Sequence, residues 1–235
     1  MLLLALDTSG TGVGVAVHDG SSVLAEVAVP GSQKHAEQLM PAVVAALGRA
    51  GVDRSALTAL VVGVGPGPFT GLRVGLVTAQ VLGAALGVPV HGVCSLDAIA
   101  EAVAGAGQAE PFLVATDARR REVYWAGYEV AAGPWAWRRL DGPHVAAPAD
   151  VPVERDGVRR VVCGPGVALY PELLGAGPVP ADVTAGVGAG AIATIAARAL
   201  LAGEDLAQGR LVEPKPWYLR RPDAVPSHSR KRVLQ

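Results

Sequence analysis

The chain has 235 residues, of which 51% are hydrophobic and 17% charged, so it can bury a substantial core. Its formal net charge of −1 excludes nucleic-acid binding through a positive field over the whole molecule, although a local basic patch is compatible with this balance. Cys94 and Cys163 lie far apart without CxxC spacing, which is typical of buried thiols in a reducing compartment and indicates the cytoplasm. The apolar run Leu2 to Leu6 ends at Asp7, which predicts a buried strand rather than a signal peptide or a membrane span.

The first hundred residues predict the element order βββαβαβα. Leu39, Val43 and Leu47 recur every four residues, which is typical of one face of an amphipathic helix. Runs of apolar or alternating residues bounded by Gly, Pro or Asp predict the strands. The expected strands are 2–6, 13–17, 22–29, 59–64 and 89–93, and the expected helices are 34–51, 71–86 and 95–104.

The pattern becomes weaker after residue 105. We expect strands at 111–116, 122–130, 135–140 and 159–163, an irregular loop at 142–156 and a helix at 187–201. The sequence thus predicts an α/β fold with an N-terminal lobe (1–104), a smaller C-terminal lobe (105–209) and a basic, partly disordered tail (210–235). This tail is either a solvated end of the chain or a contact for tRNA or an acidic partner.

The segment GVGPGPFTGLRVG, residues 63–75, connects a strand to a helix. It fits neither the Walker loop nor the dinucleotide fingerprint, so two common nucleotide-binding motifs are excluded. It is either a tight turn or a helix start whose backbone amides at Gly67, Phe69, Thr70 and Gly71 contact an anion, with Arg73 as a further candidate contact. Arg73 lies at the unfavourable end of the helix dipole, so we expect a carboxylate or a carbonyl to hold it.

The helix after this loop carries a stripe of small residues at four-residue spacing, formed by Gly71, Gly75, Ala79 and Gly83. Such a stripe allows close approach of another element. Either it packs inside its own domain, or it meets another protein together with the Leu39, Val43 and Leu47 face of the preceding helix. The second alternative predicts a two-helix interface that also supports self-association.

Five segments occur in the order found in one bacterial family: LALDTS, HAEQLMP, GVGPGPFTGLRVG, PVHGVCSLDAIA and TDARRREVYWAGY. Over roughly its first 130 residues the chain resembles the TsaB (YeaZ) family, whose members belong to the machinery that makes threonylcarbamoyladenosine in tRNA. The phrase GPGxFTGLRxG carries most of this resemblance. One departure is Pro68, where the family commonly has Ser, and it weakens an anion role for that position.

The resemblance implies the actin-like ATPase superfold (ASKHA, related to Hsp70 and sugar kinases). It also implies a non-catalytic scaffold that forms a heterodimer with TsaD and works with the ATPase TsaE. The substrate of this complex is tRNA, and no association with a membrane is expected. No tightly bound cofactor is expected, and ATP or ADP is a candidate ligand at the junction with TsaD. Ser95 and Ile99 stand where TsaD has metal-binding histidines, so no metal is expected.

A different function class is an autonomous kinase or ATPase that uses Asp7 and Asp117. Asp7 and Thr8 are candidate nucleotide contacts at the end of the first strand, but no basic residue follows them closely. Three arginines follow Asp117, so that carboxylate is expected to cap a turn or to pair with them. A third class is a regulatory homodimer.

Overall fold

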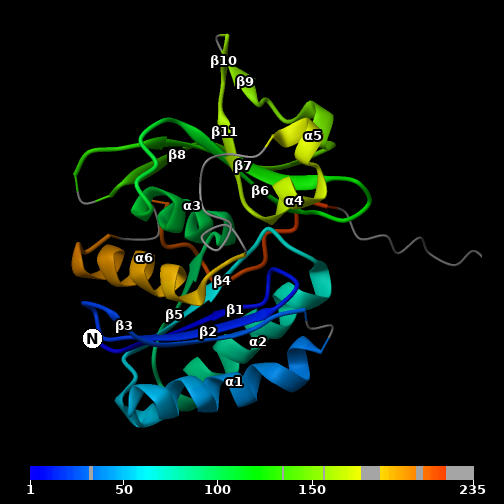
Figure 1. Cartoon of the computed structure of the whole chain (residues 1–235). Helices are drawn as coiled ribbons and strands as arrows, with labels where there is room; N and C mark the ends of the chain where they lie inside the picture. Colours follow the sequence, from blue (N-terminus) through cyan, green and yellow to red (C-terminus); the bar gives the residue numbers. More distant parts are fainter. Residues whose placement is uncertain (32–33, 134, 156, 176–185, 205–208, 221–235) are drawn as a thin grey trace, which may run out of the picture.

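The computed structural model describes residues 1–31, 34–133, 135–155, 157–175, 186–204 and 209–220, and it confirms the α/β class. Its first sheet has the strand order β3-β2-β1-β4-β5 (Figure 1). These strands are β1 (Leu3–Asp7), β2 (Val13–His18), β3 (Val23–Val29), β4 (Ala59–Gly63) and β5 (Val90–Val93). β1 runs antiparallel to β2 and parallel to β4, which brings the carboxyl ends of β1 and β4 to the same edge.

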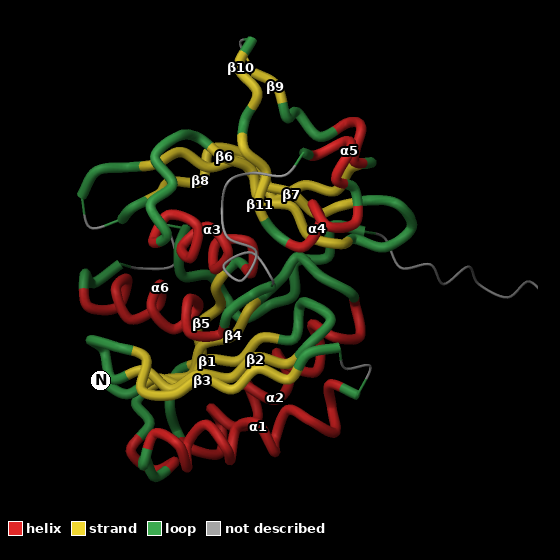
Figure 2. The backbone as a smooth tube through the Cα atoms, viewed as in Figure 1, coloured by secondary structure: helices red, strands yellow, loops and turns green. Residues whose placement is uncertain are grey.

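Helices cover both faces of this sheet (Figure 2). On one face lie α1 (His35–Ala50) and α2 (Phe69–Leu86), and on the other lies α6 (Ala189–Leu201). Because neighbouring residues of a strand point to opposite faces, Leu4 of β1 packs toward α1 and α2, while Leu3 packs in the core that contains α6. The predicted order βββαβαβα is confirmed, with the short helix η1 (Arg54–Ala56) before β4.

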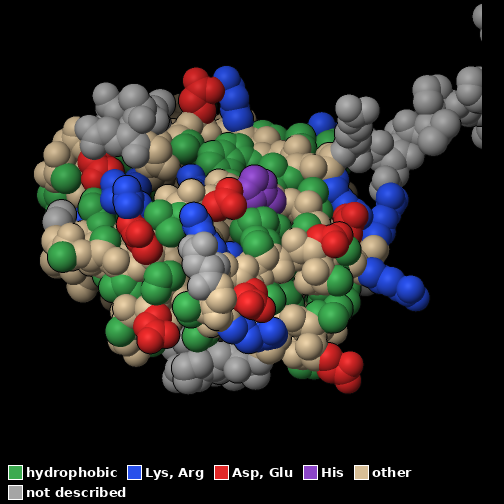
Figure 3. Space-filling model, turned by 90° about the horizontal axis from the view of Figure 1, so that it is seen from above, with side chains coloured by type: hydrophobic (Ala, Val, Ile, Leu, Met, Phe, Trp, Pro, Cys, Tyr) green, Lys and Arg blue, Asp and Glu red, His purple; other side chains and the backbone are tan. Residues whose placement is uncertain are grey.

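A second sheet has the strand order β11-β6-β7-β8. Its strands are β6 (Phe112–Asp117), β7 (Val123–Val130), β8 (Trp137–Ala146) and β11 (Val161–Cys163). Its connections and flanking elements are α3 (Ser95–Gly105), η2 (Pro148–Asp150), the hairpin β9 (Glu154–Arg155) and β10 (Val158–Arg159), α4 (Pro165–Leu169) and α5 (Pro171–Leu174). From above, Figure 3 shows acidic and basic side chains interspersed with hydrophobic ones.

The structure corrects the prediction of an irregular loop at 142–156. β8 pairs with β7 as far as Ala146, which lies opposite Val123. Pro143 is tolerated here because β8 is an edge strand and its pairing with β7 is irregular at this point, between the pairs Trp125–His144 and Gly127–Asp141. The strand predicted at 159–163 is also divided, into the end of β10 and β11.

A buried ion pair links α3 to the second sheet. Asp97 is 1% exposed, and its Oδ1 and Oδ2 lie 3.0 and 3.2 Å from Nη1 of Arg139 on β8. The hydroxyl of Tyr128 on β7 donates to the same carboxylate over 2.8 Å. Burial raises the pKa of Asp97, whereas the guanidinium and the hydroxyl lower it.

The last described segment, residues 209–220, returns to the first sheet. Val212 forms an antiparallel bridge with Gly92 of β5, and the Trp217 N–H donates to the Val64 carbonyl over 2.9 Å. The Arg220 Nη1 donates to the Ala118 carbonyl over 2.9 Å. The remainder of the predicted tail, 221–235, lies outside the described residues.

α2 is the one helix in the described part of the chain that is long and apolar enough, by length and composition, to cross a membrane. A core helix of a globular protein passes the same test. Here α2 packs against β1, β4 and β5, so some of its apolar residues belong to the core beneath the first sheet.

Candidate functional site

Asp7 lies at the carboxyl end of β1 and is 3% exposed. Its Oδ1 accepts hydrogen bonds from the Ser9 N–H (2.9 Å) and the Ser9 hydroxyl (2.8 Å), and its Oδ2 accepts one from the Ser95 hydroxyl (2.9 Å). A Cβ on Gly63 would lie 1.8 Å from Oδ2, so this arrangement requires glycine there. Burial raises the pKa of Asp7, and the bonds from Ser9 and Ser95 lower it in part. The carboxylate is thus enclosed by its own chain.

Thr8 fixes the start of α2 against β1. Its hydroxyl donates to the Gly71 carbonyl over 2.7 Å and accepts from the Gly75 N–H over 3.0 Å. A Cβ on Gly71 would lie 2.6 Å from the Thr8 carbonyl oxygen, and one on Gly75 would lie 2.5 Å from the Thr8 Oγ1. The glycines therefore allow the helix to approach its own sheet.

The structure consequently corrects the predicted partner face. Ala79 is fully buried, a Cβ on Gly83 would lie 2.3 Å from a methyl of Val90, and Leu47 is half-buried. Leu39 and Val43 are buried too, in the core under the same sheet. Of the two alternatives for the stripe, packing inside the domain is the one observed. The physical reason is that a sheet, like a second helix, favours small residues where backbones approach closely.

The opposite sides of the same two helices are exposed. The exposed fractions are 42% for Met40, 67% for Val44, 54% for Val77 and 61% for Val81. Sequence reasoning missed these residues because apolar side chains on an amphipathic helix are normally assigned to the core. The signal was present, since α2 is apolar on nearly all sides.

Arg73 is held by aromatic rings, not by the carboxylate or carbonyl predicted. Its Nε donates to the Tyr218 hydroxyl over 2.9 Å, and its guanidinium carbon lies 3.8 Å from the centre of the Phe69 ring. The rings of Phe69 and Tyr218 are 4.8 Å apart. Because Tyr218 is 145 residues from Arg73, no local pattern indicated this contact.

The other candidate anion contacts are divided between core and surface. Gly67 is buried, and a Cβ on it would lie 2.4 Å from the Ser9 carbonyl oxygen. Thr70 is exposed on the first turn of α2. The glycine at position 67 thus allows the loop after β4 to lie in close contact with the loop after β1.

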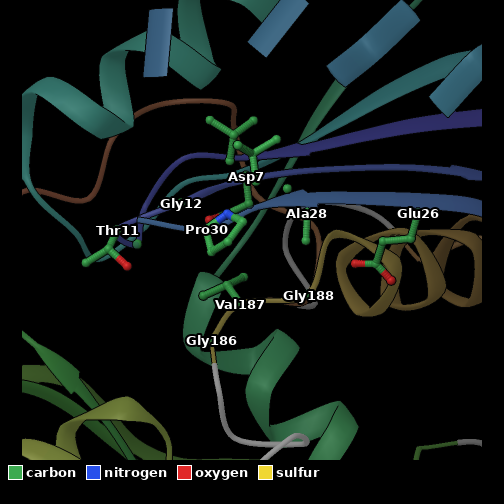
Figure 4. Close-up of a pocket in the computed structure, with 13 residues that line it drawn as sticks. Asp7, Thr11, Gly12, Glu26, Ala28, Pro30, Gly186, Val187 and Gly188 are labelled. Atoms are coloured by element: carbon green, nitrogen blue, oxygen red, sulfur yellow. The ribbon is translucent and has the colours of Figure 1, made fainter. Parts of the chain in front are cut away.

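A cavity of about 340 Å³ lies beside Asp7 (Figure 4). Its lining comes from residues 10–14, from the residues before α6 and from β3, which contributes the carboxylate of Glu26. The Glu26 carboxylate accepts a hydrogen bond from the Gly190 N–H over 3.0 Å, so it is bound to the first turn of α6. The described lining residues include Asp7 and Glu26 but no Lys or Arg, which disfavours a phosphate group.

Asp117 ends β6 and caps the turn that follows, as predicted. Its Oδ1 accepts from the Arg119 N–H over 2.7 Å, and its Oδ2 lies 3.2 Å from the Arg119 Nη1. Within the described ranges, no three His, Cys, Asp or Glu side chains form a group that could hold a metal ion. Ser95 is bound to Asp7, and Ile99 is fully buried.

Comparison with known proteins identifies the family. The chain is 33% identical to the tRNA threonylcarbamoyladenosine biosynthesis protein TsaB of Haemophilus influenzae over 180 residues, which cover 72% of this chain and 74% of that protein. The chain belongs to the TsaB (YeaZ) family. The solved structure of YeaZ from Pseudomonas aeruginosa matches with a TM-score of 0.75 and 31% identity, covering 93% of this chain and 99% of the other.

Two further comparisons match a related family model and an uncharacterized protein. Residues 24–138 match the family model described as TsaD, tRNA N6-adenosine threonylcarbamoyltransferase. An uncharacterized protein of Mycobacterium leprae is 41% identical over 96% of this chain. The match covers 56% of the M. leprae protein, so the chain spans little more than half the length of that relative.

Proposed function

We propose that the chain is a non-catalytic scaffold that binds TsaD. With TsaE it supports threonylcarbamoylation, in the cytoplasm, of the adenosine next to the anticodon of tRNAs that read codons beginning with A. The actin-like superfold and its two lobes are part of this proposal, and the strand order β3-β2-β1-β4-β5 of the first sheet supports the superfold. The role in tRNA threonylcarbamoyladenosine biosynthesis for which the TsaB relatives are named supports the pathway.

The observation that carries the scaffold role is the exposed side of α1 and α2. We call it the outer face and define it by Met40, Val44, Val77 and Val81, whose exposed fractions range from 42% to 67%. Both helices lie on the same side of the first sheet (Figure 1), so the outer face extends over two neighbouring elements. An apolar surface shared by two helices is typical of a site for a protein partner.

The surroundings of the two candidate catalytic carboxylates support a non-catalytic role. Asp7 receives three hydrogen bonds from Ser9 and Ser95, and Asp117 is paired with Arg119. An autonomous kinase or ATPase needs these carboxylates to face a nucleotide and its metal. We therefore propose that ATP or ADP binds at the junction with TsaD rather than in the acidic cavity beside Asp7.

The scaffold proposal is tested with the double variant V77E/V81E, which places two charges on the outer face of α2. TsaD binding, measured by titration calorimetry, is expected to fall at least tenfold, roughly 1.4 kcal/mol or more. The control is V158E on β10, where Val158 is 62% exposed and far from α2 in the fold. Unchanged TsaD binding by V77E/V81E, with an unchanged circular dichroism spectrum, refutes the proposed face.

Self-association without TsaD is expected to use the same outer face. Sedimentation of the wild-type chain is expected to show a dimer that V77E/V81E dissociates and V158E does not. Titration of the isolated chain with ATP and magnesium tests the non-catalytic role, and turnover of ATP would favour the autonomous enzyme.

A further inference from the structure

The turn between β6 and β7 contains three consecutive arginines in the left-handed region. The φ angles are 61° for Arg119, 53° for Arg120 and 61° for Arg121. The turn is closed by hydrogen bonds from the Glu122 N–H to the Arg119 carbonyl and from the Ala118 N–H to the Glu122 carbonyl, both of 3.0 Å. The left-handed region is disfavoured by roughly 1–2 kcal/mol for a residue with a Cβ. Contacts with the surrounding structure therefore stabilise the backbone of this turn.

Arg220 from the C-terminal segment supports the turn. It donates to the Ala118 carbonyl over 2.9 Å and forms an ion pair with Glu122. The turn and its support thus bring four arginines together with two carboxylates, Asp117 and Glu122. Arg119, Arg120 and Arg121 are exposed. The local charge is positive, although the whole chain has a net charge of −1.

Figure 3 shows basic side chains at the right-hand edge of the molecule. This edge is the end of the β6–β7 hairpin, where Arg220 also lies. The cavity next to Arg119 has a volume of about 80 Å³. Pockets for drug-sized molecules enclose roughly 300–1,000 Å³, so this cavity is too small for a ligand of nucleotide size. The exposed arginines can instead contact an extended anion that lies across the surface.

Guanidinium groups match the geometry of phosphate oxygens, and phosphate contacts supply most of the affinity of proteins for nucleic acids. We propose that the Arg119–Arg121 turn, supported by Arg220, binds the phosphodiester backbone of RNA. The identity of that RNA as tRNA rests on the proposed function. The acidic surface of a protein is the competing partner, and the experiment below separates the two.

The test uses the double variant R120A/R121A in the complex of the full chain with TsaD and labelled, unmodified tRNA. Alanine has a Cβ like arginine, so the substitution leaves the backbone preference of the turn nearly unchanged. Binding is measured by fluorescence anisotropy from about 50 to 200 mM salt. The affinity at low salt is expected to fall roughly tenfold, and the salt dependence to become flatter by about one unit for each arginine that contacts a phosphate.

The matched control is R54A/R155A, which removes two exposed arginines from η1 and β9. It is expected to leave both the affinity and the salt dependence unchanged. Wild-type affinity and salt dependence in R120A/R121A would overturn the proposal. Loss of TsaD binding with unchanged RNA binding would also overturn it, by assigning the turn to a protein partner.

The same titration on the chain without TsaD separates this inference from the proposed function. The effect of R120A/R121A on RNA binding requires no partner, whereas V77E/V81E tests TsaD binding alone. RNA binding by the chain alone that R120A/R121A weakens would support the turn even if TsaD did not bind.

Discussion

At the scale of single residues, two neighbouring arginines on β8 differ sharply in their surroundings. The Arg139 side chain is 19% exposed and pairs with the buried Asp97, whereas the Arg138 side chain is 66% exposed and pairs with Glu129. Taking away one partner of a buried pair leaves a charge without compensation, but exposed pairs contribute little. The stabilisation by these arginines therefore depends on burial rather than on the presence of an ion pair.

We expect Arg139→Met to lower the free energy of unfolding by about 3–5 kcal/mol. Arg138→Met is expected to lower it by less than about 1 kcal/mol. Urea unfolding followed by circular dichroism measures both. Equal effects of the two substitutions would show that the Asp97 carboxylate finds other compensation.

Asp7 and Asp53 should give opposite dependences on pH. Burial raises the pKa of Asp7 above 3.8, so the folded chain holds its proton more tightly, and this contribution to stability is lost as pH rises through the folded pKa. Hydrogen bonds from Ser55 lower the pKa of Asp53, so its contribution is present above 3.8 and is lost as pH falls through the folded pKa.

Between about pH 3.5 and 7, we therefore expect Asp7→Asn to become more stable relative to wild type as pH rises. Asp53→Asn is expected to become less stable relative to wild type as pH rises toward 3.8 from below, which is the range in which the folded Asp53 carboxyl group titrates. Thermal unfolding across both pH ranges provides the measurement. A difference between Asp7→Asn and wild type that stays constant with pH would contradict the assigned environment of Asp7.

At the scale of elements, the glycines of the two helices on the first sheet serve different purposes. A Cβ on Gly75 in α2 would lie 2.5 Å from the Thr8 Oγ1, whereas a Cβ on Gly48 in α1 would meet nothing within 4 Å. Alanine in a helix interior is otherwise favoured over glycine by roughly 0.5–1 kcal/mol. The two positions should therefore respond to the same substitution with opposite signs.

Gly75→Ala is expected to lower the free energy of unfolding by about 1–3 kcal/mol through overpacking. Gly48→Ala is expected to raise it by about 0.5–1 kcal/mol through helix propensity. Thermal unfolding of the two variants gives the comparison. A stabilising Gly75→Ala would mean that α2 can move away from Thr8 without cost.

The elements themselves were largely predictable, because apolar runs such as Leu2 to Leu6 and four-residue spacing as in Leu39, Val43 and Leu47 are local signals. The orientation of α2 was not, because a small-residue stripe fits a sheet and a helix equally well. Thr8 decides between them only once the fold brings it to Gly71 and Gly75. The helices α4 and α5 are too short to show a period.

In the candidate site, too, local contacts were predictable from the sequence and long-range contacts were not. The turn cap at Asp117 follows from adjacent residues and was predicted, whereas the contact of Arg73 with Tyr218 joins distant parts of the chain. The limits 1–104, 105–209 and 210–235 remain predictions. In the described structure, α6 from the second of these ranges packs on the first sheet.

At the scale of the whole molecule, the position of α6 affects how the protein can fold during synthesis. The first sheet is complete in sequence at Val93, but the helix that covers the Leu3 and Ala5 side spans Ala189–Leu201. Ribosomes add roughly 5–20 residues per second, so this apolar side waits about 5–20 s for its cover. During this interval the nascent chain exposes an apolar surface that chaperones can bind, and its native core cannot close before Leu201 has been synthesised.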